Sequence, residues 1–278
     1  MERKVKVYIP NRTMKMGVWV WYEMFNALVS NRELIGRFFI RNMLGKYKQS
    51  IFGFLWIIFI PLVAIGTFTF LNKSGVMNFG AIDVPYPVFA LIGISVWQLF
   101  SDGLSAGTES IVQSGSMVLK IKFPIEVLVF SSMAHVIFEF TVKIALILIS
   151  FVVFGYKPSV WMILFPVAVI PLMFFTLGLS MFSSLMNCVL RDTARIISLG
   201  VTFLLFLTPV MYPLEEGGSQ IMRLNPLTAL VNAPRDLIIY GHIRHFADYI
   251  VFSVVSVLFF FIAWRIFYIV ETKMPERI

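Results

Sequence analysis

Charged residues are scarce in this chain, and their scarcity excludes a soluble globular protein. Only 14% of the 278 residues are Asp, Glu, Lys or Arg, whereas 59% are apolar. A chain of this length with so few charged side chains cannot cover the surface of a soluble globule. The single cysteine, Cys188, excludes an intrachain disulfide. These absences leave a membrane protein with several spans as the expected class.

Sequence motifs for ATP hydrolysis and for metal binding are also missing. The chain has no GxxxxGK[ST] phosphate loop, so it carries no recognisable apparatus for hydrolysing ATP. Its histidines, His135, His242 and His245, form no HExxH pair, and no Cys/His cluster has the spacing of zinc ligands. No basic block with interleaved aromatic residues indicates nucleic-acid binding. We therefore expect no catalytic residue, no metal site and no nucleic-acid partner.

Long apolar windows are what the chain has instead. Each is long enough to cross a hydrocarbon core of ~30 Å as a helix, which takes about 20 residues. The six windows are 51–71, 87–111, 125–154, 160–187, 196–212 and 248–270. Membrane barrel strands would instead alternate over segments of ~10 residues. The sequence predicts an all-α membrane protein with six transmembrane helices.

The basic residues are distributed unevenly between the two sides of this arrangement. With the amino terminus taken as cytoplasmic, one residue, Lys143, lies inside a span, and 17 of the 23 Lys and Arg residues lie on the cytoplasmic side. The other side receives only Lys73, Lys157, Arg223, Arg235 and Arg244. The positive-inside rule then places both termini in the cytoplasm. The net charge of +8 is thus mostly a signal of membrane topology.

Residues 31–48, just before the first window, have the pattern of an amphipathic helix on the membrane surface. Ser30 and Glu33 form a capping-box signature at its start. One broad face can hold the apolar side chains, which are Leu34, Ile35, Phe38, Phe39 and Met43. At ~100° per residue, Arg37, Arg41 and Lys48 fall within one sector of about 40°. The pattern leaves open whether this helix touches lipid alone or a partner as well.

Two connections between the windows have unusual compositions. Residues 112–124 are more apolar than a solvated loop, which favours a helix that docks on a partner, although a loop dipping into lipid would look the same. In the last connection, 213–247, Pro226 and Pro234 interrupt the apolar part. That part is too short to cross the bilayer, so we expect short re-entrant or interfacial helices there.

The third window contains a stripe of polar residues at helical spacing. Ser131, His135, Glu139 and Lys143 recur every four residues and so lie on one side of a helix. Charges at membrane depth cost several kcal/mol unless they are paired or hydrated, which makes such residues candidates for function. Two interpretations remain: a buried Glu139–Lys143 pair that sets helix packing, or a proton or ion relay.

The second window combines polar residues with small ones. Gly103 and Gly107 have the GxxxG spacing that lets helices approach closely, and close packing is a better interpretation than a dimer seam. Asp102 could line a hydrated path. Aromatic rings could offer stacking surfaces to a sugar chain, so the channel candidates are Trp97, Phe100, Asp102, Phe203, Phe206 and Tyr212.

Six motifs carry a resemblance to a known family. In order, they are KYKQSIFGFLW, PYPVFALIGISVWQLFSDGLSAGTESIV, VLKIKFPIEVLVFSS, LRDTARII, LTPVMYP and NPLTALVNAPRDLI. Together with the six windows, they resemble the permease subunit of type-2 ABC exporters. The branch concerned exports polysaccharides such as O antigens, capsules and teichoic acids. The resemblance extends over residues 32–268.

This resemblance implies a homodimer bound to two copies of a separate ATPase subunit, which would hold ATP and Mg. It matches residues 31–48 to an amphipathic helix and 112–122 to a coupling helix, both placed against the ATPase. It also matches residues 224–240 to re-entrant helices. The implied ATPase-coupling residues are Arg37, Arg41, Lys46, Lys48, Met117, Lys120 and Lys122.

We therefore expect the chain to form the path of an ATP-driven exporter that moves a lipid-linked polysaccharide across the inner membrane of a bacterium. Four basic side chains at the membrane boundary could meet the pyrophosphate of a lipid carrier or only anionic lipid headgroups: Arg37, Arg41, Lys46 and Lys48. The alternatives are an ABC exporter of a drug or small lipid, and an ion-coupled secondary carrier. The expected organisation is a cytoplasmic leader with the interfacial helix over 1–50, a six-helix transmembrane domain over 51–270 and a cytoplasmic tail over 271–278.

Overall fold

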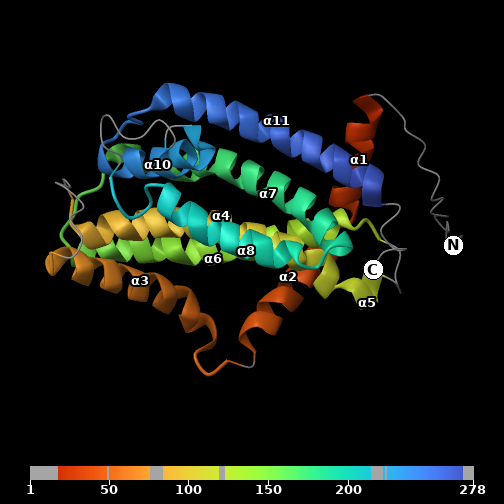
Figure 1. Ribbon diagram of the computed structural model, residues 1–278, viewed down its shortest axis with the longest axis horizontal. Coiled ribbons are helices and arrows are strands. Elements are labelled where there is room, and N and C mark those ends of the chain that lie inside the picture. Colours follow the sequence, from red (N-terminus) through yellow and green to blue (C-terminus); the bar gives the residue numbers. More distant parts are fainter. Residues whose placement is uncertain are drawn as a thin grey trace, which may run out of the picture.

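A bundle of long helices makes up the protein (Figure 1). The computed structural model describes residues 18–48, 50–75, 84–118, 123–213, 222 and 224–271, and no strand occurs among them. The helices are α1 (Val18–Ser30), α2 (Arg32–Tyr47), α3 (Trp56–Lys73), α4 (Tyr86–Gln113), α5 (Gly115–Val118), α6 (Glu126–Val153), α7 (Phe165–Val189), α8 (Thr193–Leu207), α10 (Pro226–Ile239) and α11 (Phe246–Val270), with short 3-10 helices η1 (Gly53–Leu55) and η2 (Val160–Leu164). The all-α prediction is confirmed for this part of the chain. Residues 1–17 of the leader, and all of the tail except Glu271, lie outside the described residues.

Five helical segments are long and apolar enough to cross a membrane. They are Gly53–Leu71, Tyr86–Gln113, Glu126–Val153, Val160–Val189 and Phe246–Val270, and each agrees with a predicted window to within a few residues. In the remaining window, 196–212, the helix α8 has 15 residues and ends at Leu207. At 1.5 Å per residue α8 is about 22 Å long, which is shorter than a hydrocarbon core of ~30 Å. A sixth crossing therefore stays a prediction.

The helix α4 lies at the centre of the bundle, packed against α6 and α7, while α7 also packs against α11. Glycine permits the close approach of α4 to α7. A Cβ atom on Gly107 would lie only 2.4 Å from Cβ of Ser180, and one on Gly103 would lie 2.8 Å from Cγ2 of Thr176. The GxxxG spacing thus serves close packing within the chain, which is the interpretation favoured from the sequence.

After α8 the chain leaves the helix and continues as buried, irregular backbone. Arg235 of α10, which is fully buried, donates to the carbonyl oxygens of Val210 at 2.9 Å and Pro209 at 3.2 Å. Its guanidinium lies 4.0 Å above the ring centroid of Phe89 in α4. Irregular backbone inside a membrane protein needs partners of this kind for its carbonyls. Arg235, which the sequence analysis assigned to an outer connection, clamps this segment against α4.

The helix α1 was not predicted from the sequence. It lies at the end of the bundle that also holds α5 and the carboxyl end of α11, whereas α10 lies at the other end (Figure 1). The ring of Trp21 packs edge-on against Phe261 and Trp264 of α11, with centroid distances of 5.4 and 6.2 Å. A stretch of the leader is therefore part of the packed structure.

The start of α2 differs from the predicted capping box. Ser30 is the last residue of α1, and Asn31 occupies the N-cap position of α2 without a capping side-chain bond. Instead, Nδ2 of Asn31 donates back to the carbonyl oxygen of Ala27 at 2.7 Å. The capping-box prediction was wrong because the chain was already helical before Ser30, so the break between the two helices falls at Asn31.

Candidate functional site

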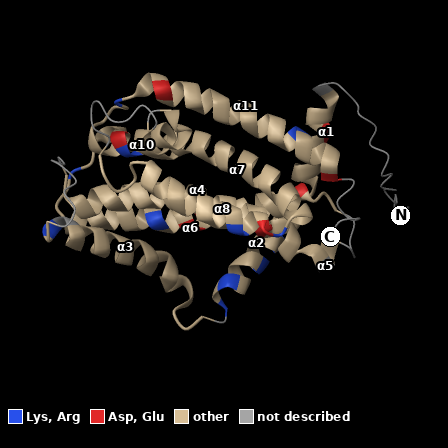
Figure 2. Ribbon diagram, in the orientation of Figure 1, with Lys and Arg blue, Asp and Glu red and all other residues tan. Residues whose placement is uncertain are grey.

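The apolar face of α2 packs against the bundle. Phe38 is buried and its ring lies 5.5 Å from that of Phe123, just before α6. Phe39 makes an edge contact with Phe138 of α6 at 6.0 Å. The basic residues of α2 and its end remain exposed: Arg32, Arg37, Arg41, Lys46 and Lys48. Figure 2 shows Lys and Arg along α2, while charged residues are few along the middle of the bundle. The amphipathic pattern therefore fixes α2 on α6 and leaves its basic face accessible.

Arg41 joins α2 to the segment 112–124, which was predicted from the sequence to dock on a partner. Its Nη2 donates to Oγ of Ser114 at 2.8 Å, and its Nη1 lies 3.9 Å from Sδ of Met117. Ser114 is the residue that ends α4, and Met117 lies in α5. Partial burial lowers the pKa of Arg41 from its ordinary value of 12.5. The coupling candidates Arg41 and Met117 are thus in contact, while Lys120 and Lys122 lie outside the described residues.

The last two residues of α2 both bind Glu139 in the membrane-spanning helix α6. Nζ of Lys46 lies 2.6 Å from Oε1 of Glu139, and the hydroxyl of Tyr47 donates to the same oxygen. Nε2 of His135 lies 3.0 Å from that oxygen, in an orientation that makes no directed hydrogen bond. Burial, and then the hydrogen bond to Glu139, raise the pKa of Tyr47, so its hydroxyl keeps its proton at neutral pH. We call this group of four residues the Glu139 joint.

A second ion pair connects α6 to α4. Nζ of Lys143 lies 3.3 Å from Oδ2 of Asp102, and Lys143 is buried. Glu139 and Lys143 are therefore paired with residues of other helices and not with each other, which corrects the packing interpretation made from the sequence. Ser131 donates to the carbonyl oxygen of Leu128 within α6 at 2.8 Å. The charged part of the stripe makes contacts between α2, α4 and α6.

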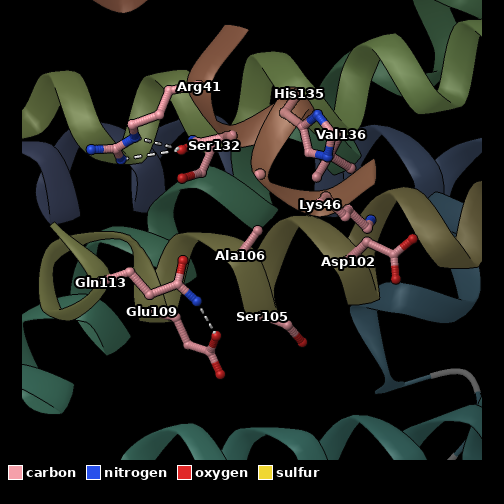
Figure 3. A pocket seen from close by; sticks show the side chains of 12 residues that line it. Arg41, Lys46, Asp102, Ser105, Ala106, Glu109, Gln113, Ser132, His135 and Val136 are labelled. Carbon is pink, nitrogen blue, oxygen red and sulfur yellow. Dashed lines mark hydrogen bonds between the residues drawn. The ribbon is translucent and has the colours of Figure 1, made fainter. Parts of the chain in front are cut away.

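A cavity of about 680 Å³ with polar and apolar lining lies between these three helices (Figure 3). Its lining contains two cationic side chains, Arg41 and Lys46, and two anionic ones, Asp102 and Glu109. The rest of the lining consists of amide and hydroxyl groups, the imidazole of His135, and Gly45, Ala106 and Val136. Glu109 accepts a hydrogen bond of 2.7 Å from Gln113. The formal charges balance, so the cavity offers donors and acceptors without the excess positive charge that favours a phosphate group. Arg41 and Lys46 also have partners within the chain already.

The aromatic channel candidates do not gather in one place. Trp97 and Phe100 are buried in α4, with ring centroids 5.4 Å apart. Phe203 and Phe206 are exposed on α8, and the hydroxyl of Tyr212 donates to the carbonyl oxygen of Phe206 at 2.8 Å. Of these aromatic candidates, Phe203 and Phe206 on α8 are the exposed ones that could meet another molecule in a single chain. A channel role for these residues remains a prediction.

Sequence reasoning missed two residues of this site, Tyr47 and Ser114. Tyr47 could have been noticed, because it is a hydrogen-bonding aromatic residue between two candidate lysines at the membrane boundary. Nothing in the local sequence distinguishes Ser114 from other serines. Its contact with Arg41 depends on how α2 lies across the end of α4.

Comparison with known proteins assigns the class of this helical bundle. The sequence matches the ABC-2 type transporter family over residues 33–239, which is more than half of the chain. The chain belongs to this family. The matched region begins in α2 and ends with α10, so it includes the contact of Arg41 with Ser114 and Met117 as well as the Glu139 joint.

Three relatives are similar to the chain over most of its length. The O-antigen export system permease protein RfbA of Myxococcus xanthus is 28% identical over 262 residues, which cover 91% of this chain and 97% of the relative. Two proteins of the same name from Klebsiella pneumoniae are each 30% identical. One aligns over 205 residues, 72% of this chain and 78% of the relative, and the other over 220 residues, 77% and 81%.

Proposed function

We propose that this chain is the membrane permease of an ATP-driven exporter that moves a lipid-linked polysaccharide of the O-antigen class across the cytoplasmic membrane of a bacterium. The observation that carries the proposal is the similarity along nearly the full length to a permease named for O-antigen export. Five apolar helices of membrane-spanning length fit that role. As a permease, the chain supplies the path and not a catalytic centre.

The energy source in this proposal is a separate ATPase subunit. The chain has no phosphate loop, so ATP and Mg would be held by the partner. The contact of Arg41 with Ser114 and Met117 supports the docking site, because it joins α2 and α5 into one unit at one end of the bundle. Two permeases and two ATPases would form the complete exporter, with the path between the permeases.

The proposed topology has six crossing segments and both termini in the cytoplasm. The distribution of basic residues supports this orientation. In it, α8 and the buried segment after it form the fifth crossing, and α10 is a re-entrant helix. The buried Arg235 supports the placement of α10 within the membrane domain, since it bonds irregular backbone that would otherwise be unsatisfied.

Two alternative functions are an ion-coupled carrier and an ABC exporter of a drug or small lipid. An ion-coupled carrier needs titratable groups free to exchange an ion, whereas Glu139 and Lys143 are each held in an ion pair with another helix. That observation favours an ATP-driven permease. An ABC exporter of a drug or small lipid would share the architecture, and the named relatives favour the polysaccharide.

Deletion of the gene followed by fractionation of cellular glycans tests the proposal. We expect lipid-linked polysaccharide to accumulate on the cytoplasmic side and to disappear from the cell surface, with both changes reversed by the wild-type gene. An unchanged glycan profile would contradict the proposal. Export in inverted vesicles separates the energy sources: it should require ATP and persist when a protonophore removes the proton gradient, whereas an ion-coupled carrier would stop.

A further inference from the structure

The Glu139 joint holds the end of α2 to a membrane-spanning helix through a single carboxylate. Glu139 is 3% exposed, yet two donors on its bound oxygen come from α2 and not from its own helix. A carboxylate at this depth is costly unless donors surround it. The pairing with Lys46 and Tyr47 therefore stabilises both the buried charge and the position of α2.

The joint lies at the point where the chain turns from α2 toward the first span. The ring of Tyr47 packs against Phe54 in η1 at 4.6 Å, and the amide of Ser50 donates to the carbonyl oxygen of Tyr47 at 3.2 Å. Gly53 turns the chain with a φ of 47°, which favours glycine. We call the segment from Lys46 to η1 the elbow.

The elbow has few other attachments to the bundle. Ile51 is 98% exposed, and Phe52, Phe54 and Leu55 are also exposed or only partly covered. The basic side of α2 is likewise exposed. The direction and position of the elbow relative to α6 thus depend strongly on the Glu139 joint.

Polar contacts extend from the joint into the bundle. Glu139 binds α2, and Lys143, one turn further along α6, binds Asp102 of the central helix α4. Arg41, earlier on α2, binds the end of α4 and α5. A displacement of α2 is therefore opposed by two polar contacts, the Glu139 joint and the contact of Arg41, and of these two the joint is the one bonded to α6.

We infer that Glu139 is a positioning residue for transport, which fixes the elbow to α6 so that a movement imposed on α2 and α5 is passed to the membrane-spanning helices. The inference rests on the proposed function, because it assumes that an ATPase moves α2. With the joint lost, the carboxyl end of α2 and the elbow can follow the ATPase without α6, while the earlier part of α2 stays packed on α6 through Phe38 and Phe39. ATP hydrolysis then continues without a matching movement of substrate.

The test is Glu139→Gln in the complete permease–ATPase complex, reconstituted with lipid-linked glycan. Gln keeps the size and an acceptor oxygen but removes the charge that holds Lys46. We expect the amount of glycan exported per ATP hydrolysed to fall by about tenfold, within the usual range of coupling between sites. Complex assembly and ATP hydrolysis should remain close to those of the wild type.

Two further variants separate positioning from folding. Tyr47→Phe removes only the hydroxyl and keeps the ring on Phe54, so export per ATP should fall in the same direction by a smaller factor. The exchange Lys46→Glu with Glu139→Lys restores an opposite pair and should recover part of the export lost with Glu139→Gln. The matched control is Asp192→Asn, which neutralises a carboxylate in an exposed pair with Arg195 and should change nothing.

The outcomes distinguish this inference from the function on which it rests. If the wild-type complex exports no glycan, the proposed function fails and the inference fails with it. If the wild type exports but Glu139→Gln and Tyr47→Phe both keep its ratio of export to hydrolysis, only the inference is overturned. A proportional fall of export and hydrolysis, or a loss of assembly in both variants, would also overturn it, because the joint would then serve stability alone.

Discussion

The helices α4 and α8 are both apolar, yet α4 is buried inside the bundle and α8 is exposed. In α4, 78% of the most apolar window is buried, whereas the described residues of α8 include no buried one. The residues that let α4 approach its neighbours are small, as at Gly103 and Gly107. Exposed Ile, Leu and Phe side chains cover α8. The apolar character alone makes a membrane helix, and the placement of small residues indicates which helix packs against protein.

The sharpest way to test this comparison is to shorten one phenylalanine in each helix. Phe100 of α4 is 1% exposed, and Phe203 of α8 is 69% exposed. We expect Phe100→Ala to lower the free energy of unfolding by about 3–5 kcal/mol and Phe203→Ala by roughly 0.5 kcal/mol or less. Thermal unfolding of the purified subunit in detergent measures both. Equal losses would mean that α4 is not the centre of the bundle.

Arg235 connects the two regions, since it holds the segment after α8 against α4. Arg235→Ala leaves the carbonyl oxygens of Pro209 and Val210 without their donors and removes the contact with Phe89. The expected loss is roughly 3 kcal/mol, because each unsatisfied buried group costs about 1–3 kcal/mol. The exposed Arg195→Ala on α8 is the control. Melting temperatures that match for the two variants would contradict the clamp.

Adding one methyl group to each helix should change the free energy of unfolding by a smaller amount, with opposite signs for α4 and α8. Gly107→Ala places its Cβ against Ser180, and overpacking of this kind costs about 1–3 kcal/mol. Gly200→Ala on α8 meets nothing within 4 Å, so the higher helix propensity of Ala should stabilise by up to about 1 kcal/mol. The same detergent melting assay reports both signs. Stabilisation by Gly107→Ala would refute the close contact between α4 and α7.

The exposed face of α8 is a candidate contact surface in the proposed homodimer. A substitution there should change the stability of the single subunit least of all. If a second copy of the chain covers α8, Phe203→Ala should weaken self-association while the melting temperature of the single subunit stays within a degree or two. Light scattering of the detergent-solubilised protein over a range of concentrations measures the dimer fraction. An unchanged dimer fraction would place the contact between copies elsewhere.

Hydropathy was sufficient for the five long spans, because apolar length is a local property of the sequence. It did not predict α1, whose place depends on Trp21 meeting α11. The sequence also placed Arg235 in an outer connection, since a basic residue directly after Pro234, in a segment interrupted by two prolines, resembles a loop. The burial of that side chain follows from its bonds to the segment after α8, which no local pattern indicates.

The candidate site was predicted in part. The amphipathic helix and the apolar connection after α4 were both identified from composition, and the structure joins them through Arg41. The polar stripe of α6 was found from its spacing. Its partners were not, because Glu139 and Lys143 pair with Lys46 and Asp102, which lie 93 and 41 residues away along the chain. Such pairs are fixed by helix packing.

The central claim is that α2 and the elbow transmit motion from the ATPase to the bundle, and a flexible insertion tests it most directly. Four Gly and Ser residues placed between Gln49 and Ser50 would uncouple α2 from α3, and the same insertion after the exposed Gly75 serves as the control. In the complete exporter, we expect the first insertion to abolish glycan export while ATP hydrolysis continues, and the control insertion to keep both. Full export with wild-type hydrolysis after the first insertion would contradict it.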